Sequence, residues 1–435
     1  MSAVSEFRHL LRGSGFRRLA AARLVSQLGD GMFQAGLASV LFFDPDPGHQ
    51  SSAGGIAVGF VLLFAPFTFV GPFVGPLIDR WQRQRILLVG NLLRFGLAGL
   101  LWYLLVADGP APLLYAAALV SLSINRFLLA AMTAAIPRVV SDEDLLTANS
   151  VLPTLGTLAA LAGAGVGVVV TFFAPGLPDR MQPMAALVLA GATFGVSSWL
   201  AARIGRRDLG PVDPLDGAHL REHLRDLVHG LRTGAAYLAR RVTPLHALLV
   251  MGAQRFLYGL MFVASILISR EILAGPSSDQ GLGKFGLVLV AAGVGFGAAA
   301  IVTPLLGPLI SRHTWIVACL MVGAAGQGLL ALSSREAVLL AAAVVVSFAV
   351  QGGKIAVDTI VQRDCEDAVR GRAFTLYDMT YNLALMASAG VCVIVLPESG
   401  YSVAVMGFAA LGYVVLAVVY AFAPRQPRPL PVGAV

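Results

Sequence analysis

The chain has 435 residues, of which 57% are hydrophobic and only 13% are charged, whereas a soluble domain has about 25% charged residues. A soluble fold could not bury that much apolar surface, so the composition excludes a soluble globular protein and predicts one embedded in lipid. The formal net charge of +7 fits contact with an anionic membrane surface and gives no reason to expect a nucleic-acid partner.

Apolar runs of about 20 residues, the length that a helix needs to cross the hydrocarbon core of a bilayer, recur along the whole chain. The first half contains runs over 19–43, 54–78, 86–107, 111–136, 151–174 and 183–204. The second half contains runs over 244–273, 283–310, 315–332, 336–354, 373–396 and 401–422. We therefore expect an all-α integral membrane protein with twelve transmembrane helices.

Basic residues are distributed unevenly between the two sides of this arrangement. If both termini lie inside, 22 of the 31 Lys and Arg residues fall in cytoplasmic segments and four in outer loops. Positive charge is enriched on the cytoplasmic side of membrane proteins. We therefore expect a multi-pass protein of the cytoplasmic membrane with cytoplasmic N and C termini.

The sequence GPLIDRW at 75–81 is nearly repeated as GPLISRH at 307–313, which lies 232 positions later. A second echo, with an offset of 225, pairs Arg138 and Asp142 with Arg363 and Asp367. Each echo joins corresponding positions of a six-plus-six arrangement of helices, and internal repeats of this kind are a known way to build transporters. The chain is thus expected to contain two pseudo-symmetric six-helix bundles.

Between the two halves lies a polar stretch with leucines at helical spacing, which predicts an amphipathic helix along the inner membrane surface. His219 and His223 stand four apart there, but no acidic or Cys partner completes a metal site, so we expect none. The predicted domains are an N-terminal bundle over 1–204, a cytoplasmic linker over 205–243, a C-terminal bundle over 244–423 and a cytoplasmic tail over 424–435.

The loop sequence GPLIDRWQRQR resembles the signature of the major facilitator superfamily, in which a Gly, an Asp, an Arg and a basic pair occupy the loop between helices 2 and 3. Gly75, Asp79, Arg80 and Arg83 match this signature, whereas Gln84 stands at the second basic position. The resemblance implies twelve helices and a gate on the cytoplasmic side. We expect Asp378, in the first turns of helix 11, to complete this gate; the alternative is that the arginines are simple positive-inside anchors.

Three ionisable residues lie at mid-membrane depth, where charge is costly and usually functional. Asp30, Arg126 and Arg255 each lie 11 residues from the inner end of an apolar run, about 16 Å at 1.5 Å per residue. They belong to helices 1, 4 and 7, which line the central cavity in the family that this chain resembles.

We expect Asp30 to be the proton-titrating acid and Arg126 to be its partner, because burial and a nearby cation act on the carboxyl in opposite directions. A static ion pair is the alternative. The predicted substrate cavity contains Gln27, Gln34, Arg126, Gln254, Arg255, Tyr381 and Asn382.

The remaining charges within the apolar runs are given structural roles. Arg23 and Arg94 lie close enough to the inner face for their side chains to reach the headgroups. Lys354 and Asp358 stand four apart on one helix and are expected to pair locally.

No GxxxxGK[ST] motif is present, so ATP is not expected to drive this protein directly, and no cofactor or enzymatic activity is predicted. The buried acid favours a proton gradient, with sodium as the alternative ion. The stretch 136–168 resembles that of bacterial drug and metabolite efflux permeases, although Ala164 stands where an antiporter signature has proline.

We expect a monomer that exports a small hydrophobic or amphipathic compound by proton antiport. Two alternatives stay open: proton-coupled uptake of a small, anionic solute, and a non-transporting receptor or scaffold with the same fold.

Overall fold

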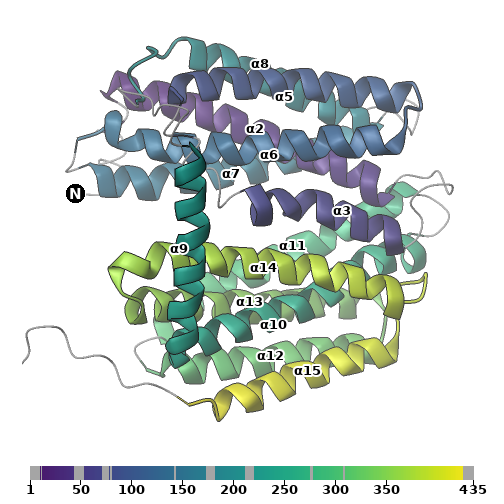
Figure 1. Cartoon of the computed structure of the whole chain (residues 1–435). Coiled ribbons are helices and arrows are strands. Elements are labelled where there is room, and N and C mark those ends of the chain that lie inside the picture. Colours follow the sequence, from purple (N-terminus) through teal and green to yellow (C-terminus); the bar gives the residue numbers. More distant parts are fainter. Residues whose placement is uncertain are drawn as a thin grey trace, which may run out of the picture. The chain divides into compact units, whose positions relative to one another are not determined.

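The computed structural model describes residues 10, 12–43, 53–70, 78, 81–141, 144–172, 182–210, 220–274, 278–306 and 309–424. Over these residues the chain is helical, and each of the twelve expected spans contains a helix (Figure 1). The all-α fold class is therefore confirmed.

In the first half, the helices are α2 (Ser14–Phe43), α3 (Ala53–Ala65) continued by the π-helical turn η1 (Pro66–Val70), α5 (Arg83–Val106), α6 (Ala111–Ala135) continued by η3 (Ile136–Arg138), α7 (Leu145–Phe172) and α8 (Gln182–Ala202). In the second half, they are α9 (Leu220–Arg240), α10 (Val242–Leu267) continued by η6 (Ile268–Ile272), α11 (Ser278–Leu306), α12 (Arg312–Leu332), α13 (Glu336–Asp364), α14 (Asp367–Val395) and α15 (Val403–Ala421).

Ten of the helices in the described part are long and apolar enough to cross a bilayer. The helix α2 is not among these ten, because polar residues such as Gln27, Asp30 and Gln34 interrupt its apolar sequence. The stretch over 55–70, from α3 into η1, is apolar but shorter. The polar residues of α2 make it the helix whose sequence most clearly indicates a buried functional group.

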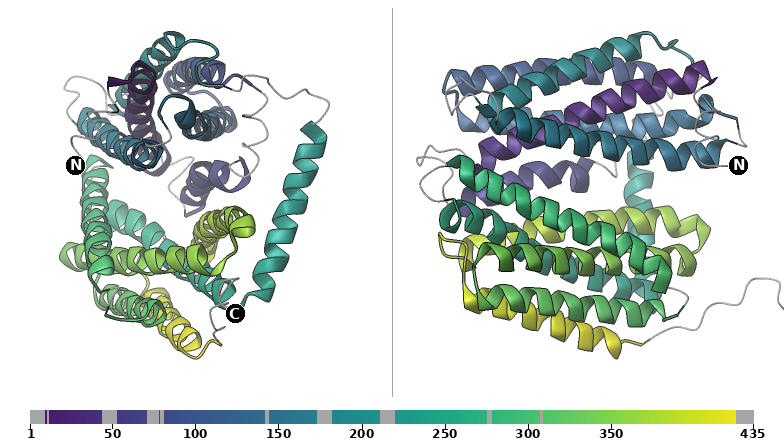
Figure 2. Two further views of the ribbon diagram at one scale, coloured as in Figure 1. Left: turned by 90° about the vertical axis from the view of Figure 1, so that its left-hand side faces the viewer. Right: turned by 180° about the vertical axis from the view of Figure 1, so that it is seen from behind.

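Contacts between Cα atoms group the chain into two compact units. Unit 1 contains residues 1–45 and 69–226, and unit 2 contains residues 46–68 and 227–435. The short helix α3 belongs to unit 2, where it packs against α14. Within each unit the long helices run roughly along one direction (Figure 2).

The helix pairings support the internal repeat. In unit 1, α2 packs against α7 and α8, and α5 packs against α6 and α8. In unit 2, α10 packs against α14 and α15, and α12 packs against α13 and α15. Since α10 and α12–α15 are the counterparts of α2 and α5–α8 in chain order, both units are built from the same pairs.

Two interhelical hydrogen bonds of unit 1 are made by serine hydroxyls, and small polar side chains are a common way to join helices in lipid. Ser197 Oγ donates to the carbonyl of Ala22 at 2.9 Å, and Ser198 Oγ donates to the carbonyl of Leu88 at 2.8 Å. The serines thus tie α8 to both α2 and α5.

Two glycines let α2 and α7 approach at backbone distance. A Cβ added to Gly31 would overlap the carbonyl oxygen of Ala160, and one added to Gly163 would overlap that of Leu28. Unit 2 contains a matching crossing, in which a Cβ at Gly259 of α10 would overlap Ser388 of α14. Gly163 therefore serves close helix packing next to Asp30.

The expected amphipathic helix is α9, whose described residues contact the N-terminal end of α14 in unit 2. Gly230 and Gly234 face Arg372, and Tyr237 Oη donates to Glu366 at 3.3 Å. Figure 1 shows α9 running across the direction of α10 and α14. This is the orientation that a helix on the membrane surface requires relative to membrane-spanning helices.

We predict that Gly163→Ala destabilises the protein by about 1–3 kcal/mol or more, because the added methyl group forces α2 and α7 apart. Gly165→Ala is the matched control on the same helix, since a Cβ there meets nothing within 4 Å. It should be neutral or stabilise the helix by up to about 1 kcal/mol. Thermal unfolding of the purified variants in detergent measures both, and equal midpoints for the two variants would contradict the close crossing.

Candidate functional site

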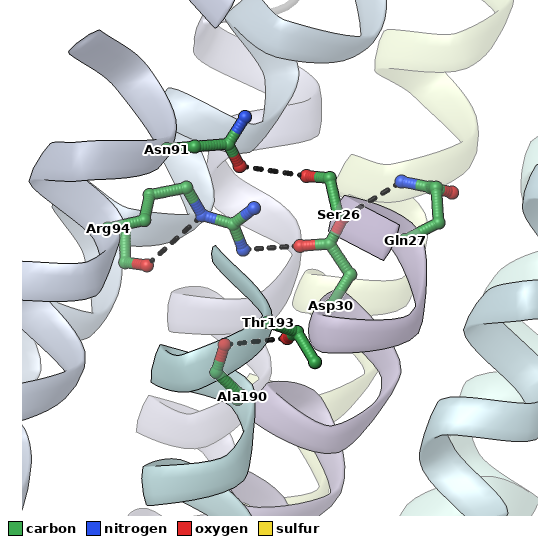
Figure 3. Close-up of polar contacts among 8 residues, drawn as sticks. Ser26, Gln27, Asp30, Asn91, Arg94, Ala190 and Thr193 are labelled. Atoms are coloured by element: carbon green, nitrogen blue, oxygen red, sulfur yellow. Dashed lines mark hydrogen bonds and ion pairs between the residues drawn. The ribbon is translucent and has the colours of Figure 1, made fainter. Parts of the chain in front are cut away.

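The buried acid of unit 1 pairs with an arginine of a neighbouring helix. Arg94 Nη2 of α5 donates to Asp30 Oδ1 of α2, and the two side chains are 0% and 2% exposed (Figure 3). Each charge would cost several kcal/mol to bury alone, so the pair is what makes both tolerable in the interior.

Three further side chains contact the pair. Gln27 Nε2 donates to Asp30 Oδ2 at 2.8 Å, so both carboxylate oxygens accept a hydrogen bond. The Phe194 ring of α8 lies 3.8 Å from the Arg94 guanidinium carbon, within the range of a cation–π interaction. Ser121 Oγ of α6 accepts a long hydrogen bond from Arg94 Nε at 3.5 Å. Side chains from four helices therefore surround one ion pair.

A second layer fixes the positions of α2 and α5. Ser26 Oγ donates to Asn91 Oδ1 at 3.0 Å, and Asn91 Nδ2 donates to the carbonyl of Leu87 at 2.9 Å (Figure 3). A Cβ at Gly29 would collide with Thr193 and Phe194, so the glycine lets α8 bring its aromatic ring up to Arg94. This packing holds the pair in one geometry.

The partner differs from the one expected from the sequence. Arg126 was the expected partner of Asp30, and Arg94 was placed near the inner face; the structure gives the ion pair to Arg94. Arg126 is half-buried on α6, and its positive charge also acts on Asp30. Asp30 therefore lies in the field of two arginines, of which Arg94 forms the ion pair described above.

The position of Arg94 along α5 is a sequence signal that could have identified it as a candidate partner of Asp30. The helix α5 begins at Arg83, three residues before the apolar run. Arg94 is 11 residues past that start, which is the same spacing that singled out Asp30, Arg126 and Arg255. Hydropathy alone hid this agreement, because Arg83 and Arg85 delay the apparent start of the helix.

Arg23 lies about two turns before Asp30 on α2 and is 5% exposed. A Cβ at Gly156 of α7 would lie 3.2 Å from its Nε. Its Nε and Nη1 atoms are buried without a hydrogen-bond partner in the described part of the chain. The prediction that Arg23 reaches the lipid headgroups is therefore wrong, since its guanidinium packs between helices of unit 1.

Unit 2 contains a cavity of about 290 Å³. Its lining includes Arg255, which has its guanidinium carbon 4.1 Å from the Tyr381 ring centroid and 4.9 Å from that of Tyr258. Both Arg255 and Tyr381 were expected in the substrate cavity. The full lining is Phe64, Arg255, Tyr258, Phe262, Phe296, Gln351, Tyr381 and Leu385.

The other predicted cavity residues lie elsewhere. Gln254 is 1% exposed and donates to the carbonyl of Ala349 at 3.1 Å, so it joins α10 to α13. Asn382 donates to the carbonyl of Asp378 at 2.8 Å, one turn earlier on α14. Gln34 is exposed on α2 in this structure. These three residues do not line the cavity of unit 2.

The predicted cytoplasmic gate falls partly on residues that the structure does not describe. Gly75, Asp79 and Arg80 lie outside the described ranges. Arg83 Nη1 donates to the carbonyls of Ala134 and Leu209 at 2.9 and 3.2 Å. Arg83 thus ties the start of α5 to the end of α6 and to the loop after α8, all within unit 1, while Asp378 is exposed on α14.

The predicted local pair on α13 is confirmed, since Lys354 Nζ lies 2.7 Å from Asp358 Oδ2. Of the two histidines that stand four apart in the linker, His219 lies outside the described residues. Among the residues that the structure describes, no group of three His, Cys, Asp or Glu side chains is arranged to hold a metal ion.

Comparison with known proteins identifies the family of this chain. The sequence profile of the Major Facilitator Superfamily matches residues 19–389. An uncharacterised MFS-type transporter of Mycobacterium tuberculosis is 31% identical over 425 residues, which cover 95% of this chain and 92% of the relative. A Bacillus subtilis protein that carries the provisional name bacilysin exporter BacE is 23% identical over 325 residues, 74% of each chain.

Solved structures agree on the fold. The POT family transporter PepTSo superimposes with a TM-score of 0.67 at 10% identity, covering 93% of this chain and 97% of that one. A D-xylose–proton symporter superimposes with a TM-score of 0.64 at 13% identity, covering 95% and 99%. With its profile match over most of the chain and its full-length relatives, this multi-pass membrane protein belongs to the major facilitator superfamily of secondary transporters.

Proposed function

We propose that this transporter exports a small hydrophobic or amphipathic compound in exchange for protons, and that Asp30 is the group that binds and releases the proton. The observation that carries the proposal is the ion pair between Asp30 and Arg94. A carboxyl between membrane-spanning helices is energetically costly and marks an ion pathway or proton relay by default.

Protonation changes what this pair does. Ionised Asp30 holds α2 to α5 through a charge-assisted hydrogen bond, which is about twice as strong as a neutral one. A proton on Asp30 removes the negative charge and weakens that link, while Arg94 keeps its contacts with Phe194 and Ser121. The free energy that holds α2 against α5 therefore depends on the proton, as alternating access requires of a coupling site.

Two opposing influences act on the proton of Asp30. Arg94 and Arg126 both favour the ionised carboxylate, and Gln27 donates to it. Burial acts in the opposite direction, since it favours the neutral acid. A change in hydration of the site during transport would shift this balance and so toggle the proton.

The proposal includes a gate on the cytoplasmic side made by Gly75, Asp79, Arg80, Arg83 and Asp378. The contacts of Arg83 with two carbonyl groups support an anchoring role for the start of α5. We also propose that the protein acts as a monomer in the cell membrane with both termini in the cytoplasm, as the distribution of arginines indicates.

The direction of transport is proposed from the name of a relative. The relative that carries the name of a bacilysin exporter favours export over uptake. Uptake of an anionic solute with protons is the second candidate, because Arg255 brings a positive charge to the cavity of unit 2. Sodium is the alternative coupling ion. If the protein is instead a non-transporting scaffold, the ion pair between Asp30 and Arg94 would be dispensable for function.

A double-mutant cycle tests the pairing. We predict that Asp30→Asn and Arg94→Gln are non-additive, with an interaction energy of about 0.5–3 kcal/mol, as expected for groups in contact. The cycle with Arg126→Gln should give a smaller value. Unfolding of detergent-solubilised variants measures both cycles. A larger interaction energy between Asp30 and Arg126 than between Asp30 and Arg94 would contradict the pairing of Asp30 with Arg94.

A flux assay tests the coupling. In proteoliposomes that contain a pH-sensitive dye, transport of a compound from a panel of matched cationic, neutral and anionic naphthalene derivatives should move protons in the opposite direction. Asp30→Asn should abolish the proton movement, because the residue can no longer titrate. Glu336→Gln is the control, since this carboxylate pairs with Lys284 at 2.5 Å near the helix ends.

Three outcomes of this assay would count against the proposal. Proton movement in the same direction as the compound would support symport, and dependence on a sodium gradient alone would replace the proton. Flux of no compound under any gradient would favour the scaffold.

A further inference from the structure

The cavity of unit 2 has a largely aromatic wall and one cation. Five of its eight lining residues are Phe or Tyr, and the ring centroids of Tyr258 lie 5.9 Å from Phe262 and 6.3 Å from Phe296. Phe262 is held in turn by Phe60 at 5.6 Å and Phe285 at 5.7 Å. The wall is therefore a packed cluster whose shape is set before any ligand enters.

Arg255, which is half-buried on α10, differs from the buried Arg94 of unit 1 in having no carboxylate partner among the residues that the structure describes. Among the residues that the structure describes, no salt bridge involves Arg255, and its Nε is buried without a hydrogen-bond partner. Asp358 on the neighbouring helix α13 is already paired with Lys354. Two tyrosine rings stabilise the cation by cation–π contact, which leaves its N–H groups able to bind an anion.

The internal repeat shows that this arrangement replaces an acidic one. Gly31 and Gly259, which occupy matching helix crossings, are 228 positions apart. At this offset Gln27 and Asp30 of unit 1 correspond to Arg255 and Tyr258 of unit 2. At the offset of 225 given by the second echo, which relates α6 to α13, Arg126 corresponds to Gln351. Unit 2 thus has an arginine and a tyrosine where unit 1 has a glutamine and an acid.

We infer that this cavity binds an amphipathic monoanion: a small, flat, apolar body between the rings and one carboxylate on the guanidinium of Arg255. This assignment names the substrate class of the transporter and rests on the proposed function. The planar guanidinium matches a carboxylate in two parallel hydrogen bonds, and the rings supply apolar contact. The volume of about 290 Å³, just below the usual range for ligand sites of about 300–1,000 Å³, fits a small ligand body.

Three naphthalene probes of nearly equal shape test the charge preference. Calorimetric titration of the purified full chain in a neutral detergent compares 2-naphthoate, its neutral amide and 2-naphthylmethylammonium. The wild type should bind naphthoate about tenfold or more tightly than the amide, because a charge-assisted hydrogen bond is formed only with the anion. The ammonium probe should bind most weakly, since it brings a second positive charge to Arg255.

Variants of Arg255 locate the effect. Arg255→Gln should weaken naphthoate binding about tenfold to a hundredfold and change amide binding less than twofold. Arg255→Lys keeps the charge but loses the planar fork, so it should fall between the wild type and the glutamine variant. Arg270→Gln is the matched control on the continuation of the same helix, where Arg270 pairs with Glu271, and it should bind all three probes like the wild type.

Variants of Tyr381 separate the ring from the hydroxyl. Tyr381→Phe should bind naphthoate nearly as the wild type does, whereas Tyr381→Leu should lose affinity for both naphthoate and the amide. Thermal unfolding shows which variants are folded. If Arg255→Gln does not fold, Arg255→Lys still tests the contribution of the guanidinium.

The inference is overturned if folded wild type binds naphthoate no better than the amide, if it binds no probe, or if Arg255→Gln leaves naphthoate binding unchanged. These titrations contain no proton gradient and leave Asp30 intact. A failure here therefore leaves proton coupling standing, and a failure of the Asp30 flux assay leaves the anion site standing.

Discussion

A buried carboxylate and a buried guanidinium, on two different helices, set the constraint on which the rest of unit 1 depends. Neither Asp30 nor Arg94 is tolerable alone between membrane-spanning helices, so α2 and α5 must stay in register. The glycines at 29 and 31 bring α8 and α7 close to α2, and Phe194 and Ser121 contact the guanidinium. On our proposal, a proton on Asp30 removes its negative charge and so acts on the packing of α2 against α5.

The duplicated units have diverged in chemistry while keeping their helix pairings. Unit 1 buries an ion pair, whereas the matching positions of unit 2 form an aromatic cavity around a cation that no described carboxylate neutralises. On our proposals the first unit handles the proton and the second binds the substrate. Antiport requires the two ligands to compete through the conformation of the protein, and placing them in different units lets each bias the same transition.

Hydropathy and spacing predicted the helices well because lipid imposes a length and a composition on every span. Depth counting also found Asp30 and Arg255, since charge in the hydrocarbon region is rare enough to stand out. The partner of Asp30 was missed because depth does not give the rotation of a helix. Arg94 and Arg126 are at similar depths, and which of them faces α2 depends on the packing of α5 and α6.

The aromatic cavity was also out of reach of the sequence. Phe262 and Phe296 look like ordinary apolar residues of a membrane helix, and only the contacts among α3, α10, α11 and α14 bring them around Arg255. Gln254 illustrates the converse case, because its neighbour in sequence lines the cavity while its own amide bonds to α13. One residue along a helix turns a side chain by about 100°, which is enough to separate a ligand contact from a packing contact.

The central claim is that Asp30 takes up and releases a proton, and infrared difference spectroscopy measures this most directly. Spectra of the membrane-reconstituted protein at low minus high pH should contain the carbonyl band of a protonated carboxyl group that is missing from Asp30→Asn and present in Glu336→Gln. If the Asp30→Asn spectrum keeps every carboxyl band of the wild type, Asp30 stays in one protonation state and the pair with Arg94 is only structural.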